Sequence, residues 1–130
     1  MLQTGIKGRK TMTVTEDDTA EAAGSGVLRV FATPKMIALI EATASESVSE
    51  YLEEGTSTVG TRIDVTHSAP SPVGSVIVCD TTLIEIDRRR LVFSVTARDG
   101  AGEIGSGIHE RFVVGNARFM EKAESRLADS

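Results

Sequence analysis

The clearest pattern in the chain is a set of apolar positions at helical spacing between residues 34 and 52. Ile37, Ile40, Ala44 and Val48 recur three and four residues apart, which is typical of a helix that packs one face on a core. A threonine followed by a proline stands directly before this segment, as is typical of a helix cap and first turn. The pattern therefore predicts a helix over about 34–52.

Beyond that helix the apolar spacing changes to two residues, which indicates β-strands. In the first of these strands Val59, Val65 and His67 share one face, whereas Gly60 falls on the other. Turn residues separate the later strands. The expected strands are 9–15, 59–67, 75–86, 90–98 and 104–114, and a short polar helix is expected over 116–127.

One long helix followed by four strands with short turns predicts the α+β class. With the N-terminal strand added, we expect an antiparallel five-stranded sheet wrapped around a long central helix. A length of 130 residues with 40% hydrophobic positions is enough for a core without disulfides or metals. Since no repeat or linker interrupts the pattern, we expect one domain over residues 1–130.

Composition excludes several classes of partner. The chain has 14 Lys and Arg against 19 Asp and Glu, and 4% aromatics, so it offers neither a basic field nor a stacking surface for nucleic acid. No segment approaches the roughly 20 apolar residues that span a membrane. The single Cys79 cannot form an internal disulfide, which suits a reducing compartment. We expect a cytoplasmic protein.

Three residues are candidates for chemistry, and each also has a structural explanation. Glu41 falls on the apolar face of the helix, where a carboxylate needs a charged partner or a proton, unless it lies at the margin and reaches solvent. His67 ends an apolar strand face and suits proton transfer, although many such histidines are structural. Thr33 is fully explained as a helix cap.

Secondary candidates lie on the strands. Gly60 interrupts a β-branched strand, which suits either the close approach of a ligand or a bulge. His109 and Arg111 share one face of the last strand, where structural and interface roles compete with substrate binding, and Arg111 is the better candidate of the two. The arginine run 88–90 could meet phosphates, but it is also typical of a solvated turn. No metal-ligand spacing or nucleotide-binding glycine motif is present, so we expect no metal and no cofactor.

Several ordered motifs give the chain a specific resemblance. They are Phe31-Ala32-Thr33, the segment 36–41, Val59-Gly60-Thr61, the segment 65–69 and the segment 105–111. Through these motifs the sequence resembles the fluoroacetyl-CoA thioesterase-like branch of the hot-dog superfamily. The resemblance implies a hot-dog fold, an acyl-CoA substrate and a homodimer or higher homo-oligomer. It also implies that Thr33, Glu41 and His67 form a reactive centre near the dimer interface.

The leading hypothesis is hydrolysis of a short-chain acyl-CoA thioester. Such a reaction needs an attacking oxygen, a base and donors for the oxyanion, and the three candidate residues with nearby backbone amides supply these types. Glu41 could attack the carbonyl carbon, or Glu41 or His67 could deprotonate water. The alternatives are an acyl-CoA-binding module without turnover, a hot-dog hydratase and a structural subunit.

Overall fold

The structure is a computed structural model that describes residues 1–128. Its elements are β1 (Lys7–Thr13), a 3-10 turn (Glu16–Asp18), α1 (Ala20–Ala23), α2 (Thr33–Val48), a 3-10 turn (Ser49–Tyr51), β2 (Thr56–His67), β3 (Val76–Asp87), β4 (Arg90–Asp99), β5 (Gly102–Gly115) and α3 (Asn116–Ser125). The predicted α+β class, with five strands and one long helix, is confirmed.

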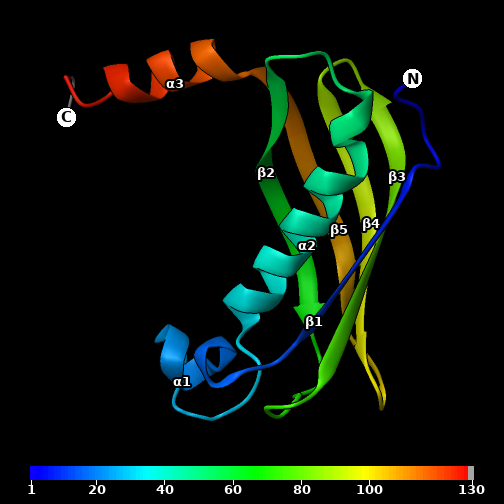
Figure 1. Cartoon of the computed structure of the whole chain (residues 1–130), viewed down its shortest axis with the longest axis vertical. Helices are drawn as coiled ribbons and strands as arrows, with labels where there is room; N and C mark the ends of the chain where they lie inside the picture. Colours follow the sequence, from blue (N-terminus) through cyan, green and yellow to red (C-terminus); the bar gives the residue numbers. More distant parts are fainter. Residues whose placement is uncertain (129–130) are drawn as a thin grey trace.

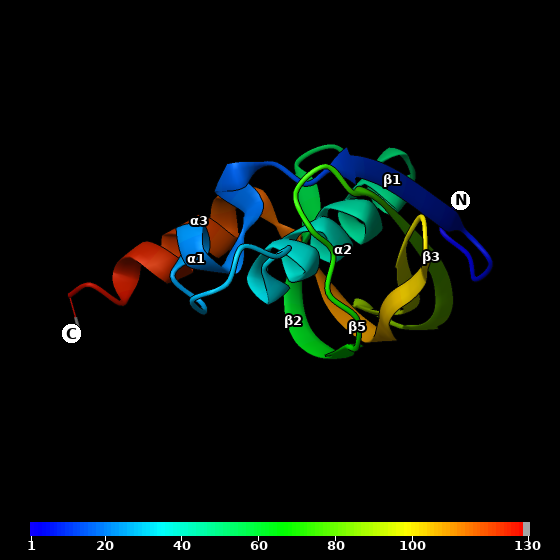
Figure 2. The ribbon, with the colours of Figure 1, turned by 90° about the horizontal axis from the view of Figure 1, so that it is seen from below.

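The five strands form one antiparallel sheet in the order β1-β3-β4-β5-β2. Figure 1 shows β2 and β5 behind α2, whereas β1 runs on the near side and crosses in front of the more distant strands. Seen from below, the sheet curves around that helix (Figure 2). The loop and helix between β1 and β2 carry the chain across the sheet, so β2 becomes the edge strand opposite β1.

The core fills the space between α2 and the concave face of the sheet. The helix buries Met36, Ile40, Ala44 and Val48, which follow one another at intervals of four residues on one face. The strands contribute Ile77, Leu83, Leu91, Phe93, Val95 and Ile104. This packing fixes α2 against the sheet, and it therefore fixes the position of every polar side chain that the helix presents to β2 and β5.

The start of α2 differs from the prediction. Ala32, with extended backbone angles, occupies the cap position without a side-chain hydrogen bond, and Thr33 is the first helical residue. The hydroxyl of Thr33 is therefore free of the capping role that its sequence context suggested. The helix ends at Val48 and continues as a 3-10 turn, so the predicted end at 52 included this turn.

β2 contains a one-residue bulge directly after Gly60, which confirms one of the two explanations offered for this glycine, although the alternation pattern assumed an unbroken strand. Gly60 pairs with Arg111, but the next partner of β5, Glu110, pairs with Arg62, so Thr61 is the extra residue. Before the bulge Gly60 faces α2, and after it Ile63 packs on the core. The prediction that Val59 shares a face with the end of the strand was therefore wrong.

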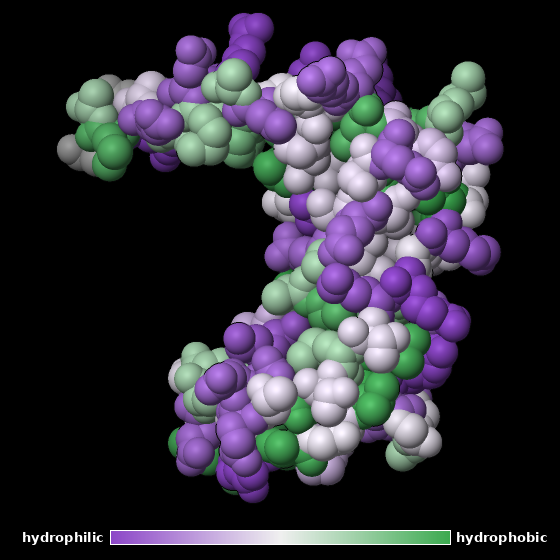
Figure 3. Space-filling model, viewed as in Figure 1, coloured by the Kyte–Doolittle hydropathy of each residue, from purple (hydrophilic) through white to green (hydrophobic). Residues whose placement is uncertain are grey.

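Two segments project from the β2 side of the molecule. The α1 region extends beyond the start of α2, and α3 extends from the end of β5, so that the two project at opposite ends of β2 (Figure 1). The space-filling view shows a hollow between them (Figure 3). Phe119 and Met120 on α3 and Val27 and Leu28 near α1 are exposed. The edge of β2 thus lies in a recess flanked by apolar side chains.

Candidate active site

Thr33 and His67 meet where the start of α2 lies over the end of β2. The Thr33 Oγ1 and His67 Nδ1 atoms are 2.8 Å apart, which is hydrogen-bond distance. Thr33 is exposed and His67 is half-buried. The contact forms because the helix starts one residue earlier than a Thr33 cap would require, which turns the hydroxyl toward the strand instead of toward the helix amides.

The His67 ring is fixed on its other sides by apolar packing. Its centroid lies 6.2 Å from that of Phe31, with the two rings nearly perpendicular. The Nε2 atom is buried without a hydrogen-bond partner among the described residues. Burial lowers the pKa of His67, because a doubly protonated ring would leave a charged N–H without a partner. The ring is therefore neutral near pH 7 and can take up a proton.

A cavity of about 320 Å³ opens beside this pair. Thr33 and His67 line it together with Phe31 and the loop that follows β2. Both polar and apolar atoms are present in its wall, as is usual for a pocket that binds a small molecule. A carbonyl that entered this cavity would meet the hydroxyl of Thr33 directly.

Glu41 lies further along α2 and contacts a different residue. Its Oε2 atom is 3.3 Å from Nη1 of Arg111, and 43% of its side chain is exposed. Arg111 itself is buried and donates from Nε to the Thr58 hydroxyl at 2.7 Å and from Nη2 to the Thr58 carbonyl at 2.8 Å. Burial is the largest influence on the pKa of Arg111 and lowers it, with Glu41 opposing that effect. Thr58 thus holds two of the three guanidinium nitrogens, and the third presents one N–H to Glu41.

Gly60 provides the space in which the Glu41 carboxylate lies. A Cβ atom built on Gly60 would collide with Glu41 Oε2 and approach Arg111 Nη1 to 3.3 Å. The absence of a side chain is therefore required by the Glu41–Arg111 pair. This explains the interruption of the β-branched strand without a ligand, although the partly exposed carboxylate beside Gly60 remains open to one.

The sequence-predicted residues form two groups within one chain. Thr33 and His67 are in contact, whereas Glu41, Gly60 and Arg111 form the second group. Thr33 and Glu41 are separated by about 12 Å of helical rise. Gly60 and His67 are separated by roughly 23 Å of strand. One chain therefore does not bring Glu41 into hydrogen-bond contact with His67.

Two further residues hold the second group: sequence reasoning missed Thr58 and treated His109 only as a weaker candidate beside Arg111. Thr58 accepts two hydrogen bonds from Arg111, one at its hydroxyl and one at its carbonyl oxygen, and Nε2 of His109 lies 3.2 Å from Arg111 Nη1. His109 and Arg111 are two residues apart on β5, and that spacing places them on one face of a strand. This spacing was the signal in the sequence that linked His109 to Arg111. No comparable signal pointed to Thr58, because the bulge decides which residues of β2 face the helix.

The remaining candidate residues lie outside these two groups. Arg90 is paired with Glu85 and Glu110, so of the arginine run only Arg88 and Arg89 have no ion pair among residues 1–128. Cys79 is fully buried, and burial raises the pKa of its thiol.

Within the described part of the chain, no three His, Cys, Asp or Glu side chains gather as metal ligands. No helix there has the length and apolar character needed to cross a bilayer.

Comparison with known proteins identifies related thioesterases. A family model described as fluoroacetyl-CoA-specific thioesterase matches residues 14–117. The fluoroacetyl-CoA thioesterase of Streptantibioticus cattleyicolor is 40% identical over 97 residues, which cover 75% of this chain and 70% of that protein. A solved structure of a fluoroacetyl-CoA thioesterase has a TM-score of 0.92 at 32% identity, covering 96% of this chain and 97% of that one.

A second solved structure adds a ligand to the comparison. It is a variant of the fluoroacetyl-CoA-specific thioesterase in complex with fluoroacetate and CoA, with a TM-score of 0.86 at 33% identity. The match covers 91% of this chain and 99% of that one. A hot-dog-like protein from Thermanaerovibrio acidaminovorans has a TM-score of 0.87 at 25% identity, covering 96% of this chain and 93% of that one. The predicted hot-dog fold is confirmed.

Proposed function

The chain belongs to the fluoroacetyl-CoA-specific thioesterase family, so its reaction is the hydrolysis of an acyl-CoA thioester, and we propose that the substrate carries a short acyl group. We further propose that Thr33, Glu41 and His67 form the centre that cleaves its thioester bond. In this reaction the carbonyl C–S bond breaks, an oxygen from water is added to the acyl carbon, and CoA leaves as the thiol. The chain must therefore supply a base for the attacking oxygen and donors for the oxyanion.

The Thr33–His67 contact is the observation that carries the proposal. A hydroxyl 2.8 Å from a neutral imidazole nitrogen has the spacing of a nucleophile and its base. When the ring hydrogen is on Nε2, Nδ1 accepts the hydroxyl proton. The Thr33 oxygen can then attack the thioester, or hold a water that does so. The cavity beside the pair is where the acyl carbonyl would lie.

The start of α2 supplies fewer oxyanion donors than its sequence suggested. The amides of Lys35 and Met36 both donate to the Ala32 carbonyl at 3.0 Å, and Pro34 has no N–H. The dipole of the helix remains, and its positive end points toward the cavity. The Thr33 hydroxyl is the polar group of this helix start that reaches His67, which supports a direct role for it in the reaction.

Glu41 would join the centre from a second copy of the chain. β2 is an edge strand, and two copies can pair antiparallel along it about a two-fold axis. In that arrangement the His67 end of one β2 runs toward the Gly60 region of the other. The hollow between α1 and α3 leaves room for the second copy (Figure 3). We therefore propose a homodimer in which the partner's Glu41 faces Thr33 and His67.

Glu41 then has two available roles. Its carboxylate can attack the carbonyl carbon to give an anhydride, or it can deprotonate a water. Single turnover in water enriched in oxygen-18 tests the first role, since label in the Glu41 carboxylate requires an anhydride that water opens at the Glu41 carbonyl carbon. Arg111 holds the carboxylate in a fixed direction for either role.

The first test is thiol release from a panel of short acyl-CoA esters. Wild type should release CoA, and Glu41→Gln and His67→Ala should each lose roughly 100-fold or more in kcat, after circular dichroism has shown that both variants fold. Turnover that survives in both variants would overturn the assigned centre. A wild type that shifts in melting temperature with acyl-CoA but releases no thiol would instead indicate a binding module.

A further inference from the structure

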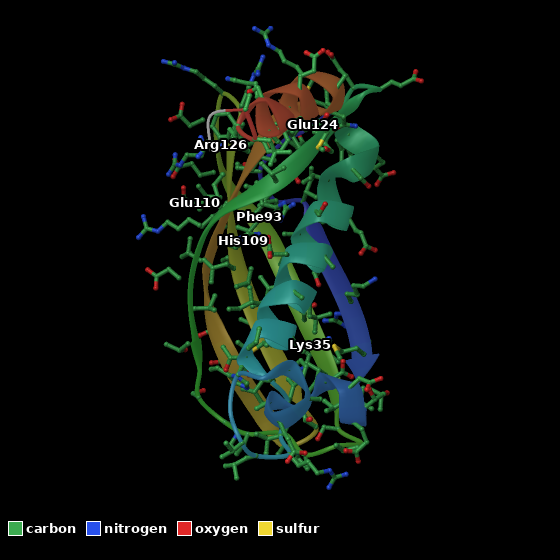
Figure 4. The ribbon with its side chains drawn as sticks, turned by 90° about the vertical axis from the view of Figure 1, so that its left-hand side faces the viewer. Lys35, Phe93, His109, Glu110, Glu124 and Arg126 are labelled. Carbon is green, nitrogen blue, oxygen red and sulfur yellow. The ribbon has the colours of Figure 1, made fainter. Side chains whose placement is uncertain are left out.

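His109 is the largest buried polar group that the proposed reaction leaves unused. Its side chain has no exposed surface. It extends from β5 into the space between the sheet and α2, and its ring centroid lies 6.3 Å from that of Phe93. Figure 4 shows His109 beside Phe93 in the interior, whereas the neighbouring Glu110 points away from it. A buried imidazole loses hydration, so its partners must account for its presence.

The two contacts of the ring fix its hydrogen on one nitrogen. Nδ1 lies 2.8 Å from the carbonyl oxygen of Arg62, and a carbonyl only accepts, so Nδ1 bears the hydrogen. Nε2 lies 3.2 Å from Nη1 of Arg111, and a guanidinium only donates, so Nε2 is the acceptor. Both contacts require the same neutral tautomer. Burial is the main reason why the pKa of His109 is lowered; the Arg62 hydrogen bond opposes this effect, and the charge of Arg111 adds to it.

The orientation of Arg111 depends on these contacts. Its Nε and Nη2 atoms are held by Thr58, and its Nη1 lies between His109 Nε2 and Glu41 Oε2. The acceptor on one side of Nη1 holds the guanidinium plane in place. The other N–H of Nη1 then points at the carboxylate of Glu41. Without that acceptor, Arg111 can rotate about the Thr58 contacts, and Glu41 loses the one donor that the structure gives it.

We propose that His109 is a positioning residue of the hydrolytic reaction, because its Nε2 lone pair holds Arg111 and through it the carboxylate of Glu41. This rests on the proposed function, since it takes Glu41 to be part of the reacting centre. The bulge in β2 contributes to this arrangement, because it places the Arg62 carbonyl beside His109 in the strand segment that follows Gly60.

Two substitutions at His109 separate this role from packing. His109→Gln places an amide oxygen near the position of Nε2 and keeps an acceptor for Arg111. His109→Asn places its amide near Nδ1, keeps a donor for the Arg62 carbonyl and loses the acceptor. Both remove the ring. The expected result is a kcat lowered by roughly tenfold or more in His109→Asn with little change in KM, and a kcat close to wild type in His109→Gln.

A double-mutant cycle with Glu41→Asp tests the connection to Glu41. The shorter carboxylate cannot reach Arg111, so His109→Asn should cost much less in that background than in wild type. Equal losses in His109→Asn and His109→Gln, or a full additive loss in the cycle, would overturn the inference. If Glu41→Gln instead keeps wild-type turnover, the proposed centre fails first, and the two failures are thereby distinguished.

The tautomer can be tested without any variant. Nitrogen-15 chemical shifts of the imidazole in the intact wild-type protein near pH 7 should show a protonated Nδ1 and an unprotonated Nε2 for His109. A hydrogen on Nε2 would place two donors against each other at the Arg111 contact. That result, or an imidazolium at neutral pH, would overturn the proposed role even if His109→Asn fails to fold.

Discussion

Thr33 and His67 lie thirty-four residues apart in the chain and share a 2.8 Å contact that replaces the helix-capping role of Thr33. The contact joins the first residue of α2 to the last residue of β2. Because the rest of each element is fixed by the core, neither side chain has to be ordered when a substrate enters. The pair is therefore pre-organised, which is the condition under which a base and a nucleophile are most effective.

Removing the Thr33 hydroxyl should affect activity much more than stability. Thr33→Val keeps the size of the side chain, and we expect kcat/KM to fall by roughly 100-fold or more. Thr33→Ser keeps the hydroxyl and should retain much of the rate. Since Thr33 does not cap α2, the free energy of unfolding of Thr33→Val should change by less than the ~1 kcal/mol that loss of a cap costs. Urea titration and thiol release measure the two quantities.

A methyl group at Gly60 should displace Glu41. In Gly60→Ala the new Cβ collides with the flexible end of the Glu41 side chain, so the carboxylate moves away from Arg111 while the backbone stays. We expect a loss of roughly tenfold or more in kcat with a small change in melting temperature. Gly100→Ala is the matched control, because a Cβ there meets no atom within 4 Å. Wild-type kinetics in Gly60→Ala would contradict the assigned position of Glu41.

Mixed dimers should recover activity from two inactive variants. Glu41→Gln and His67→Ala each spoil both sites of a homodimer. If the partner's Glu41 completes the site, each mixed dimer has one site with both residues intact. Subunit exchange of equal amounts should then restore about a quarter of wild-type activity, because about half of the dimers are mixed. No recovery in dimers shown by mass spectrometry to be mixed would place all three residues in one subunit.

Stability should fall below neutral pH because of the two histidines. The pKa values of His67 and His109 are lowered in the folded protein, mainly by burial, whereas an unfolded histidine titrates near ~6.5. The unfolded chain therefore binds protons first as the pH falls. The stabilisation is complete above ~6.5 and is lost below that value toward the folded pKa values. Urea unfolding at about pH 8 and pH 5.5 should show the decrease, and His109→Gln should reduce it.

The sequence predicted the helix and the strand order of the hairpins because their apolar periods are long and regular. Helix α2 and strands β3 to β5 follow such periods, and their cores are set by residues such as Ile40 and Phe93. The motifs also identified Thr33 and His67 as candidates. Their contact could not be derived, because it depends on whether the helix begins at residue 33 or 34, and a shift of one residue turns a side chain by about 100°.

The Arg111 network was less accessible to sequence reasoning. Arg111 was predicted to bind substrate, and that role stays a prediction, but the structure shows its guanidinium engaged with Thr58, His109 and Glu41. A period-two pattern assumes that a strand is unbroken. The extra residue in β2 violates this assumption, and although Gly60 indicated either a close approach or a bulge, it did not show which of the two explanations holds or which residue is inserted.

The extra residue at Thr61 also sets the parity of the strand. Gly60 and His67 are an odd number of positions apart, so in a regular strand one of them would face α2 and the other would face away. The inserted residue makes the count even, and both face the helix. A deletion of one residue between them would exchange inside for outside along the remainder of β2. The number of residues between Gly60 and His67 therefore decides whether both positions face α2.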